Sequence, residues 1–134
     1  MILIACVDDN LGMAFHRRRQ SQDRLLRARI LERSAGRALW MSAYSARQFD
    51  SAGEKIRVDE DCLSKAGPGE FCLAELVSPS PWADRIEQVV LYRWNRSYPS
   101  DLRFDLSLEG WRLEARTEFP GFSHEQITEE IYTR

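Results

Sequence analysis

Arginines concentrate in one stretch of this 134-residue chain, and phosphate binding is the chemistry that they could perform. Arg17, Arg18 and Arg19 are consecutive, and further arginines follow up to Arg37. A guanidinium group makes paired hydrogen bonds to phosphate oxygens, so this stretch could hold a phosphate ester or a nucleic acid. The net charge of −2 and the pI of about 5.7 argue against it, because nucleic-acid-binding domains are strongly basic. A solvated helix face in an arginine-rich protein is the simpler interpretation.

Other reactive residue types occur without the partners that their chemistry requires. His16 and His124 are too few for a metallohydrolase, so no metal site is predicted, and His124 is expected in a surface turn. Cys6 lies in an apolar run, and three cysteines do not form a disulfide framework, so we expect reduced thiols in a cytoplasmic protein. No serine stands in a G-x-S-x-G context, and no G-x-x-x-x-G-K phosphate loop occurs.

The elements that position these residues follow from the apolar pattern. Ile2–Val7 is a continuous apolar run, typical of a central strand buried on both faces, and it ends at the turn-forming residues 8–10. An exposed polar loop is expected at 17–20. Ser21 is the predicted N-cap of a helix whose apolar stripe ends at Leu31.

Most of the later elements are predicted to be strands. Residues 111–119 alternate apolar and polar side chains as a half-buried strand does, whereas 51–69 are expected to be largely irregular. Helical turns are expected at 44–50 and 82–87. Further strands or apolar runs are expected at 38–43, 71–77, 89–94, 102–104 and 127–132. This order predicts a single α/β domain, residues 1–134, with a mixed sheet and antiparallel C-terminal strands.

The start and the last third of the chain together resemble dihydrofolate reductases. Those enzymes open with an apolar strand, an acidic-Asn turn and an apolar-Gly pair, which this chain matches with Met1–Cys6, Asp8–Asn10 and Leu11-Gly12. Their last third is matched in order by residues 83–85, 89–94, 101–105, 111–118 and 130–134. The resemblance implies a dihydrofolate reductase-like mixed sheet with a shortened middle subdomain.

The resemblance also implies a substrate pocket. In the family, a carboxylate early in the first helix binds the pterin ring and assists protonation, and Asp23 is its counterpart if one extra gap is allowed. Burial would raise the pKa of such a carboxyl group and suit it to acid–base catalysis. The alternative is that Asp23 only favours the dipole of its own helix. The remaining ligand-binding candidates are Ile4, Ala5, Leu26, Trp40, Ser45 and Tyr92.

The family binds NADPH, but the residues that hold this cofactor are missing from the sequence. The Pro-Trp pair has no match in 13–19, the arginine of the G-R-x-T turn is absent from Ser42–Ser45, and the Gly-Gly step becomes Cys72–Val77. Glycine there lets the backbone approach the pyrophosphate. Asp50–Phe71 is also too short for the family's adenosine-binding unit. We therefore expect no cofactor, with NADPH as the alternative that the family implies.

Two functional hypotheses follow. The first is a binding module for a small ligand or a partner, of a specificity that the sequence does not give. The second is a divergent enzyme, either a reductase with another cofactor or an enzyme acting on phosphate esters or RNA through Arg17–Arg19 and Asp23. A homodimer or a protein partner could cover the shortened middle region. We expect no membrane contact, and nucleic acid only through Arg17–Arg37.

Overall fold

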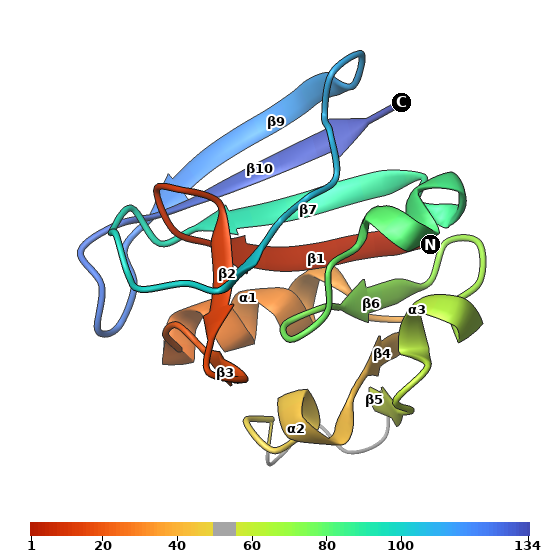
Figure 1. Cartoon of the computed structure of the whole chain (residues 1–134), viewed down its shortest axis with the longest axis horizontal. Coiled ribbons are helices and arrows are strands. Elements are labelled where there is room, and N and C mark those ends of the chain that lie inside the picture. The colour runs from red at the N-terminus through yellow and green to blue at the C-terminus, as the bar shows by residue number, and fades with distance from the viewer. Residues whose placement is uncertain (50–55) are drawn as a thin grey trace.

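The computed structural model describes residues 1–49 and 56–134, which form a twisted mixed sheet with helices on both faces (Figure 1). In the described residues the sheet has seven strands in the order β5-β4-β6-β1-β7-β10-β9. β1 (Ile2–Val7) is central, as its continuous apolar run predicts, and it lies parallel to β6 (Phe71–Leu73) and β7 (Gln88–Arg93). β4 (Leu39–Met41) and β5 (Ile56–Val58) continue the parallel part.

Two antiparallel strands complete the other end of the sheet. β10 (Ile127–Thr133) pairs with β7, and β9 (Arg112–Phe119) pairs with β10 and forms the edge. The antiparallel C-terminal strands are therefore confirmed. The expectation that β9 is half-buried is wrong, because its residues from Arg112 to Glu118 are all exposed. Its last residue, Phe119, packs against Tyr92 and lies under the guanidinium of Arg29, while the rest of the strand rises exposed along the upper edge in Figure 1.

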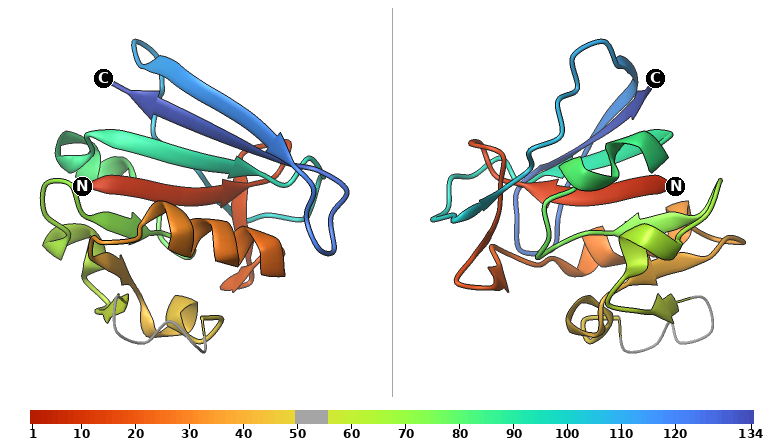
Figure 2. Two further views of the ribbon diagram at one scale, coloured as in Figure 1. Left: turned by 180° about the vertical axis from the view of Figure 1, so that it is seen from behind. Right: turned by 45° about the vertical axis from the view of Figure 1, so that its right-hand side comes forward.

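Helix α1 (Arg24–Arg33) lies across one face of the sheet and buries Leu26 and Ile30 against it (Figure 2). Its N-cap is Asp23, whose side chain accepts hydrogen bonds from backbone N–H groups of the first turn. The prediction of Ser21 as the cap is therefore wrong. Both residues are favourable N-caps by type, and the sequence alone does not tell which one has the required extended backbone.

Three short helices connect the strands. They are α2 (Ala43–Ala46), α3 (Cys62–Lys65) and the 3-10 helix η1 (Ser80–Arg85). Strand β5 lies parallel to β4, so the segment expected to be irregular contributes a strand and a helix. Residues 50–55, which fall within that segment and at the end of the helical turn expected at 44–50, lie outside the described residues.

A small second sheet crosses one end of the main sheet. It has the order β3-β2-β8, formed by β2 (Gly12–Phe15), β3 (Arg18–Arg19) and β8 (Leu102–Arg103). The loop expected at 17–20 is therefore partly a strand. His16 and Arg17 form the tight turn between β2 and β3, with φ angles of 52° and 60°. Two residues at positive φ are the geometry of a type I′ hairpin turn.

The sheet separates two apolar clusters. One contains Ile4, Leu26 and Tyr92 under α1, and the other contains Ala5 together with Leu63 of α3. Successive residues of β1 point to opposite faces, so Ile4 and Ala5 contribute to different clusters. No helix within residues 1–49 and 56–134 is long and apolar enough to cross a membrane.

Candidate functional site

Two neighbouring cavities lie where the parallel strands end, at the carboxyl edge of the sheet. In open α/β sheets this edge is the usual place for a ligand. A cavity of about 10 Å³, enough for one water, is lined by Cys6, Ser21 and Trp94 among others. A second cavity of about 160 Å³ opens beside α2. Leu73 and Glu75 line both cavities, so the two are adjacent.

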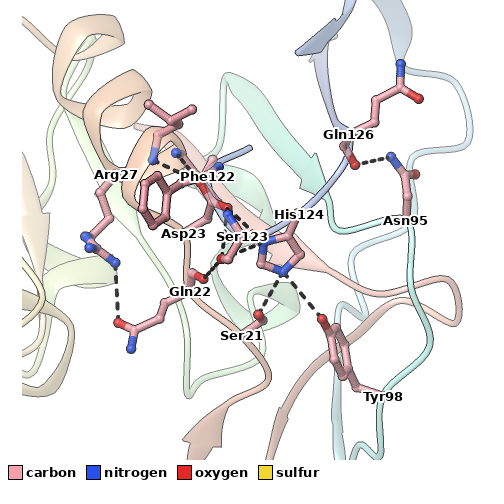
Figure 3. A network of polar contacts seen from close by, with 12 residues as sticks. Ser21, Gln22, Asp23, Arg27, Asn95, Tyr98, Phe122, Ser123, His124 and Gln126 are labelled. Atoms are coloured by element: carbon pink, nitrogen blue, oxygen red, sulfur yellow. Dashed lines mark hydrogen bonds and ion pairs between the residues drawn. The ribbon is translucent and has the colours of Figure 1, made fainter. Parts of the chain in front are cut away.

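Asp23 is the most highly coordinated side chain at this edge, and it is buried (Figure 3). Its Oδ1 accepts hydrogen bonds from the backbone N–H groups of Leu25 (2.9 Å), Leu26 (3.2 Å) and Phe122 (3.0 Å); its Oδ2 accepts them from the Ser123 backbone N–H (2.9 Å) and hydroxyl (3.2 Å) and from His124 Nδ1 (2.8 Å). Burial alone would raise the pKa of Asp23, but these hydrogen bonds outweigh it and hold the pKa well below its usual range. The carboxylate is therefore ionised at neutral pH, and every donor around it stabilises that form.

His124 links Asp23 to a serine. It is buried, with 5% of its surface exposed, which corrects the expectation that it lies in a surface turn. Its ring stacks on Trp94 with a centroid distance of 4.7 Å and an interplanar angle of 27°. On its other side, Nε2 lies 2.9 Å from Ser21 Oγ and 3.4 Å from Tyr98 Oη.

The tautomer of His124 follows from these contacts. An ionised carboxylate can only accept a hydrogen bond, so the Nδ1 atom facing Asp23 carries the proton. In the neutral ring Nε2 is then an acceptor, and the hydroxyl of Ser21 donates to it. The network of Figure 3 thus orders a serine hydroxyl, an imidazole and a carboxylate in sequence.

The predicted phosphate-binding arginines lie in different surroundings. Arg19 is paired with Glu75 through two hydrogen bonds, Nε to Oε2 at 3.0 Å and Nη2 to Oε1 at 3.2 Å, and its guanidinium stacks on Tyr44. Arg17 lines a separate cavity of about 170 Å³, and Arg18 is exposed. The guanidinium of Arg19 is thus ion-paired with a carboxylate. The three guanidinium groups do not meet in one cavity.

The predicted ligand-binding residues are divided between the two faces of the sheet. Leu26 lines the water-sized cavity together with Asp23. Ile4 and Tyr92 lie in the same apolar cluster as Leu26, and the Tyr92 hydroxyl donates to Glu129 at 2.8 Å. Tyr92 therefore contacts a carboxylate other than Asp23.

The other predicted ligand-binding residues lie elsewhere. Ala5 and Trp40 belong to the cluster on the opposite face, where Trp40 Nε1 donates to Glu70. Ser45 is buried in α2, and its hydroxyl accepts a hydrogen bond from Ser42. These three side chains do not line either cavity at the carboxyl edge that contains Leu73 and Glu75.

Several residues of this edge could not be found by sequence reasoning. His124 is separated from Asp23 by 101 positions, and no motif connects the two. Trp94 ends the strand expected at 89–94, and no sequence pattern selects Tyr98. Glu75 lies within Cys72–Val77, where the resemblance indicates only the loss of the family's glycines, although it lines both cavities.

The larger cavity does not fit a dinucleotide phosphate. It is lined by the carboxylates of Glu60 and Glu75, and Glu60 accepts a hydrogen bond of 2.9 Å from the backbone N–H of Ala43 at the start of α2. A carboxylate therefore already uses the N–H group that a phosphate would need, and it would repel the phosphate charge. In addition, α2 is a single turn of four residues.

Comparison of the whole fold identifies its class. No protein-family model matches the chain, and no curated protein matches its sequence. A solved structure of dihydrofolate reductase from Enterococcus faecalis, complexed with NADP(H) and RAB-propyl, superimposes with a TM-score of 0.69 at 10% sequence identity. The match covers 99% of this chain and 95% of the enzyme chain. The fold is dihydrofolate reductase-like. This confirms the predicted fold class, and at such low identity the likeness extends to the fold alone.

Proposed function

We propose that this dihydrofolate reductase-like chain is a binding module for a small cationic ligand, held in the larger cavity at the carboxyl edge. The single observation that carries the proposal is the carboxylate of Glu60, which lines that cavity together with Ser42 and Tyr44, whereas Glu75 is already paired with Arg19. A volume of about 160 Å³ suits a ligand of only a few heavy atoms. Carboxylates and an aromatic ring are the groups that bind ammonium and guanidinium ions.

Arg19 supports the choice of a cation. Its guanidinium lies against Glu75 and over the ring of Tyr44, at 4.3 Å from the centroid. The wall of the cavity thus already binds one planar cation from within the chain. Glu60, whose side chain is exposed, offers a second carboxylate that has no ion pair with any residue of the ranges 1–49 and 56–134.

Isothermal titration calorimetry with methylguanidine and with NADPH tests this function. We expect methylguanidine to bind and NADPH not to bind at micromolar concentration. Glu60→Gln keeps the shape of the side chain but removes its charge, and it should weaken methylguanidine binding about tenfold, which corresponds to about 1.4 kcal/mol. Glu109→Gln, an exposed glutamate in a distant turn, is the matched control. Micromolar binding of NADPH, or methylguanidine binding that Glu60→Gln leaves unchanged, would contradict the proposal.

A further inference from the structure

We propose that Ser21, His124 and Asp23 form a nucleophilic relay that hydrolyses small carboxylic esters. This inference is independent of the cation cavity and assigns a chemical reaction to the other half of the same edge. Its basis is the geometry of the three side chains, which Figure 3 shows in one connected line. Such a relay is recognised by the geometry and roles of its members, whatever their order in the chain.

The distances match those that a serine nucleophile requires. Ser21 Oγ lies 2.9 Å from His124 Nε2, and His124 Nδ1 lies 2.8 Å from Asp23 Oδ2. Nucleophile and base must be within hydrogen-bond reach, and a third group must orient the base. Both conditions hold between residues that come from opposite ends of the chain.

The surroundings fix the base in its working orientation. Trp94 stacks on the imidazole, while Asp23 is itself held by backbone N–H groups on both sides. Asp23 stays ionised, so it can stabilise the imidazolium ion that forms when His124 takes a proton. Rotation of the ring would break its hydrogen bond to Asp23. The buried carboxylate would then lack one donor, which costs free energy.

Exposure differs among the three residues in the way that the reaction needs. Asp23 and His124 are 2% and 5% exposed, whereas Ser21 is half-buried and lines the water-sized cavity. The cavity that Ser21 lines admits one water, so an ester must approach the serine from its solvent-exposed side, while the base and the carboxylate remain shielded.

The reaction proceeds in two balanced halves. Ser21 Oγ attacks the ester carbonyl carbon as its proton passes to His124 Nε2. The tetrahedral intermediate then expels the alcohol, which leaves with that proton, and an acyl-serine remains. In the second half water attacks the acyl-serine, His124 accepts the proton of the water and returns it to Ser21, and the carboxylic acid is released. The sum is ester plus water giving acid plus alcohol.

Labelling with a fluorophosphonate probe tests the nucleophile directly. The intact mass should rise by one probe adduct, and peptide mapping should place the adduct on Ser21. The nearby Ser123 provides an internal comparison, because its hydroxyl lies 3.3 Å from Nδ1, the nitrogen that already carries a proton and cannot act as a base. Ser21→Ala should lose the adduct, whereas Ser97→Ala, an exposed serine in a loop, should keep it. No adduct at all, or equal labelling of Ser21 and Ser123, would overturn the proposal.

Hydrolysis of p-nitrophenyl acetate tests the base. General-base catalysis contributes about 10²–10⁴-fold, so His124→Gln should lower the esterase rate at least about 100-fold. Circular dichroism would verify that the variant is folded. If it is not, Ser21→Cys provides a second reading, because a thiol beside His124 should react with iodoacetamide faster than a surface cysteine at pH 7. Unchanged hydrolysis in folded His124→Gln, or an ordinary thiol rate in Ser21→Cys, would refute the relay.

Glu60→Gln should not affect either measurement, so failure of the relay and failure of the cation cavity are distinguishable.

Discussion

Two buried carboxylates connect helix α1 to distant parts of the chain, and each does so through charged hydrogen bonds. Asp23 joins the start of the helix to residues 122–124. Glu129 of β10 joins the middle and end of the helix to the sheet, since it accepts paired hydrogen bonds from Arg29 and Arg33 and one from Tyr92. Burial would raise the pKa of Glu129, but these three partners hold it at about 2.

The first prediction concerns Glu129→Gln. The ordinary pKa of this side chain, about 4.5, falls to about 2 on folding, so ionised Glu129 stabilises the folded state above pH 4.5 and loses that effect as the pH falls toward 2. Such a shift corresponds to about 3 kcal/mol at neutral pH. Urea unfolding should show Glu129→Gln less stable by about this amount at pH 7, with a flatter pH dependence between pH 2 and 5. Glu118→Gln, on the exposed edge strand, should differ from the parent chain by less than about 0.5 kcal/mol.

A second prediction concerns Gly121, which lies against the Asp23–His124 contact. A Cβ atom at this position would stand 2.7 Å from Asp23 Oδ2 and 2.9 Å from the His124 carbonyl oxygen. Gly121→Ala must therefore displace both groups, and we expect it to cost about 1–3 kcal/mol of unfolding free energy. Gly67→Ala is the matched control, because the nearest atom to its Cβ, Glu70 Oε1, would lie 3.4 Å away, which is an ordinary van der Waals contact. Equal midpoints for the two variants in urea would show that the loop around Gly121 adjusts freely.

Among the elements, β9 is the one that faces water most completely. Its charged side chains alternate in sign along the strand, with ion pairs from Arg112 to Glu114 and from Arg116 to Glu118 on either side of a break in register. One edge of β9 pairs with β10, and the other edge ends the sheet. An exposed edge presents backbone groups to which another chain could add, and charged side chains are the usual protection.

The third prediction removes that protection. Glu114→Val combined with Arg116→Val places two residues of high strand propensity in the centre of the edge strand and deletes its central charges. We expect concentration-dependent self-association, visible as a higher mass by size-exclusion chromatography with light scattering. Glu114→Gln with Arg116→Gln removes the same charges but keeps polar side chains, and it should associate less. A monomeric double-valine variant at millimolar concentration would show that the twist of the strand alone prevents pairing.

At the scale of the whole molecule, sequence patterns predict the frame better than the site. Ile2–Val7 is predicted with its observed bounds because a strand buried on both faces leaves an unbroken apolar run. The apolar run 71–77 is strand only as far as Leu73, since the residues beyond it turn to line the cavities. For β9 the alternation predicts a strand correctly, yet alternation does not reveal whether another element covers its apolar face.

The candidate site depends on contacts that no local pattern encodes. The resemblance points to Asp23, but its partners outside α1 come from the loop before β10. The approach of His124 to Ser21 requires β10 to be aligned beside β7 and α1 to be placed across the sheet. Such an arrangement follows from the topology as a whole, so it becomes visible only when the fold is known.

The central position of β1 also has a consequence for the order in which the chain can fold. Its two neighbours, β6 and β7, come from the second half of the sequence. During synthesis the strand therefore emerges before either neighbour, and until they follow both of its edges are unpaired and its apolar side chains uncovered. Structures that depend on such distant pairings fold slowly, and their unpaired strands are prone to aggregation meanwhile. The strand whose backbone and side chains are most completely buried in the folded protein is thus the strand most exposed to non-native pairing during synthesis.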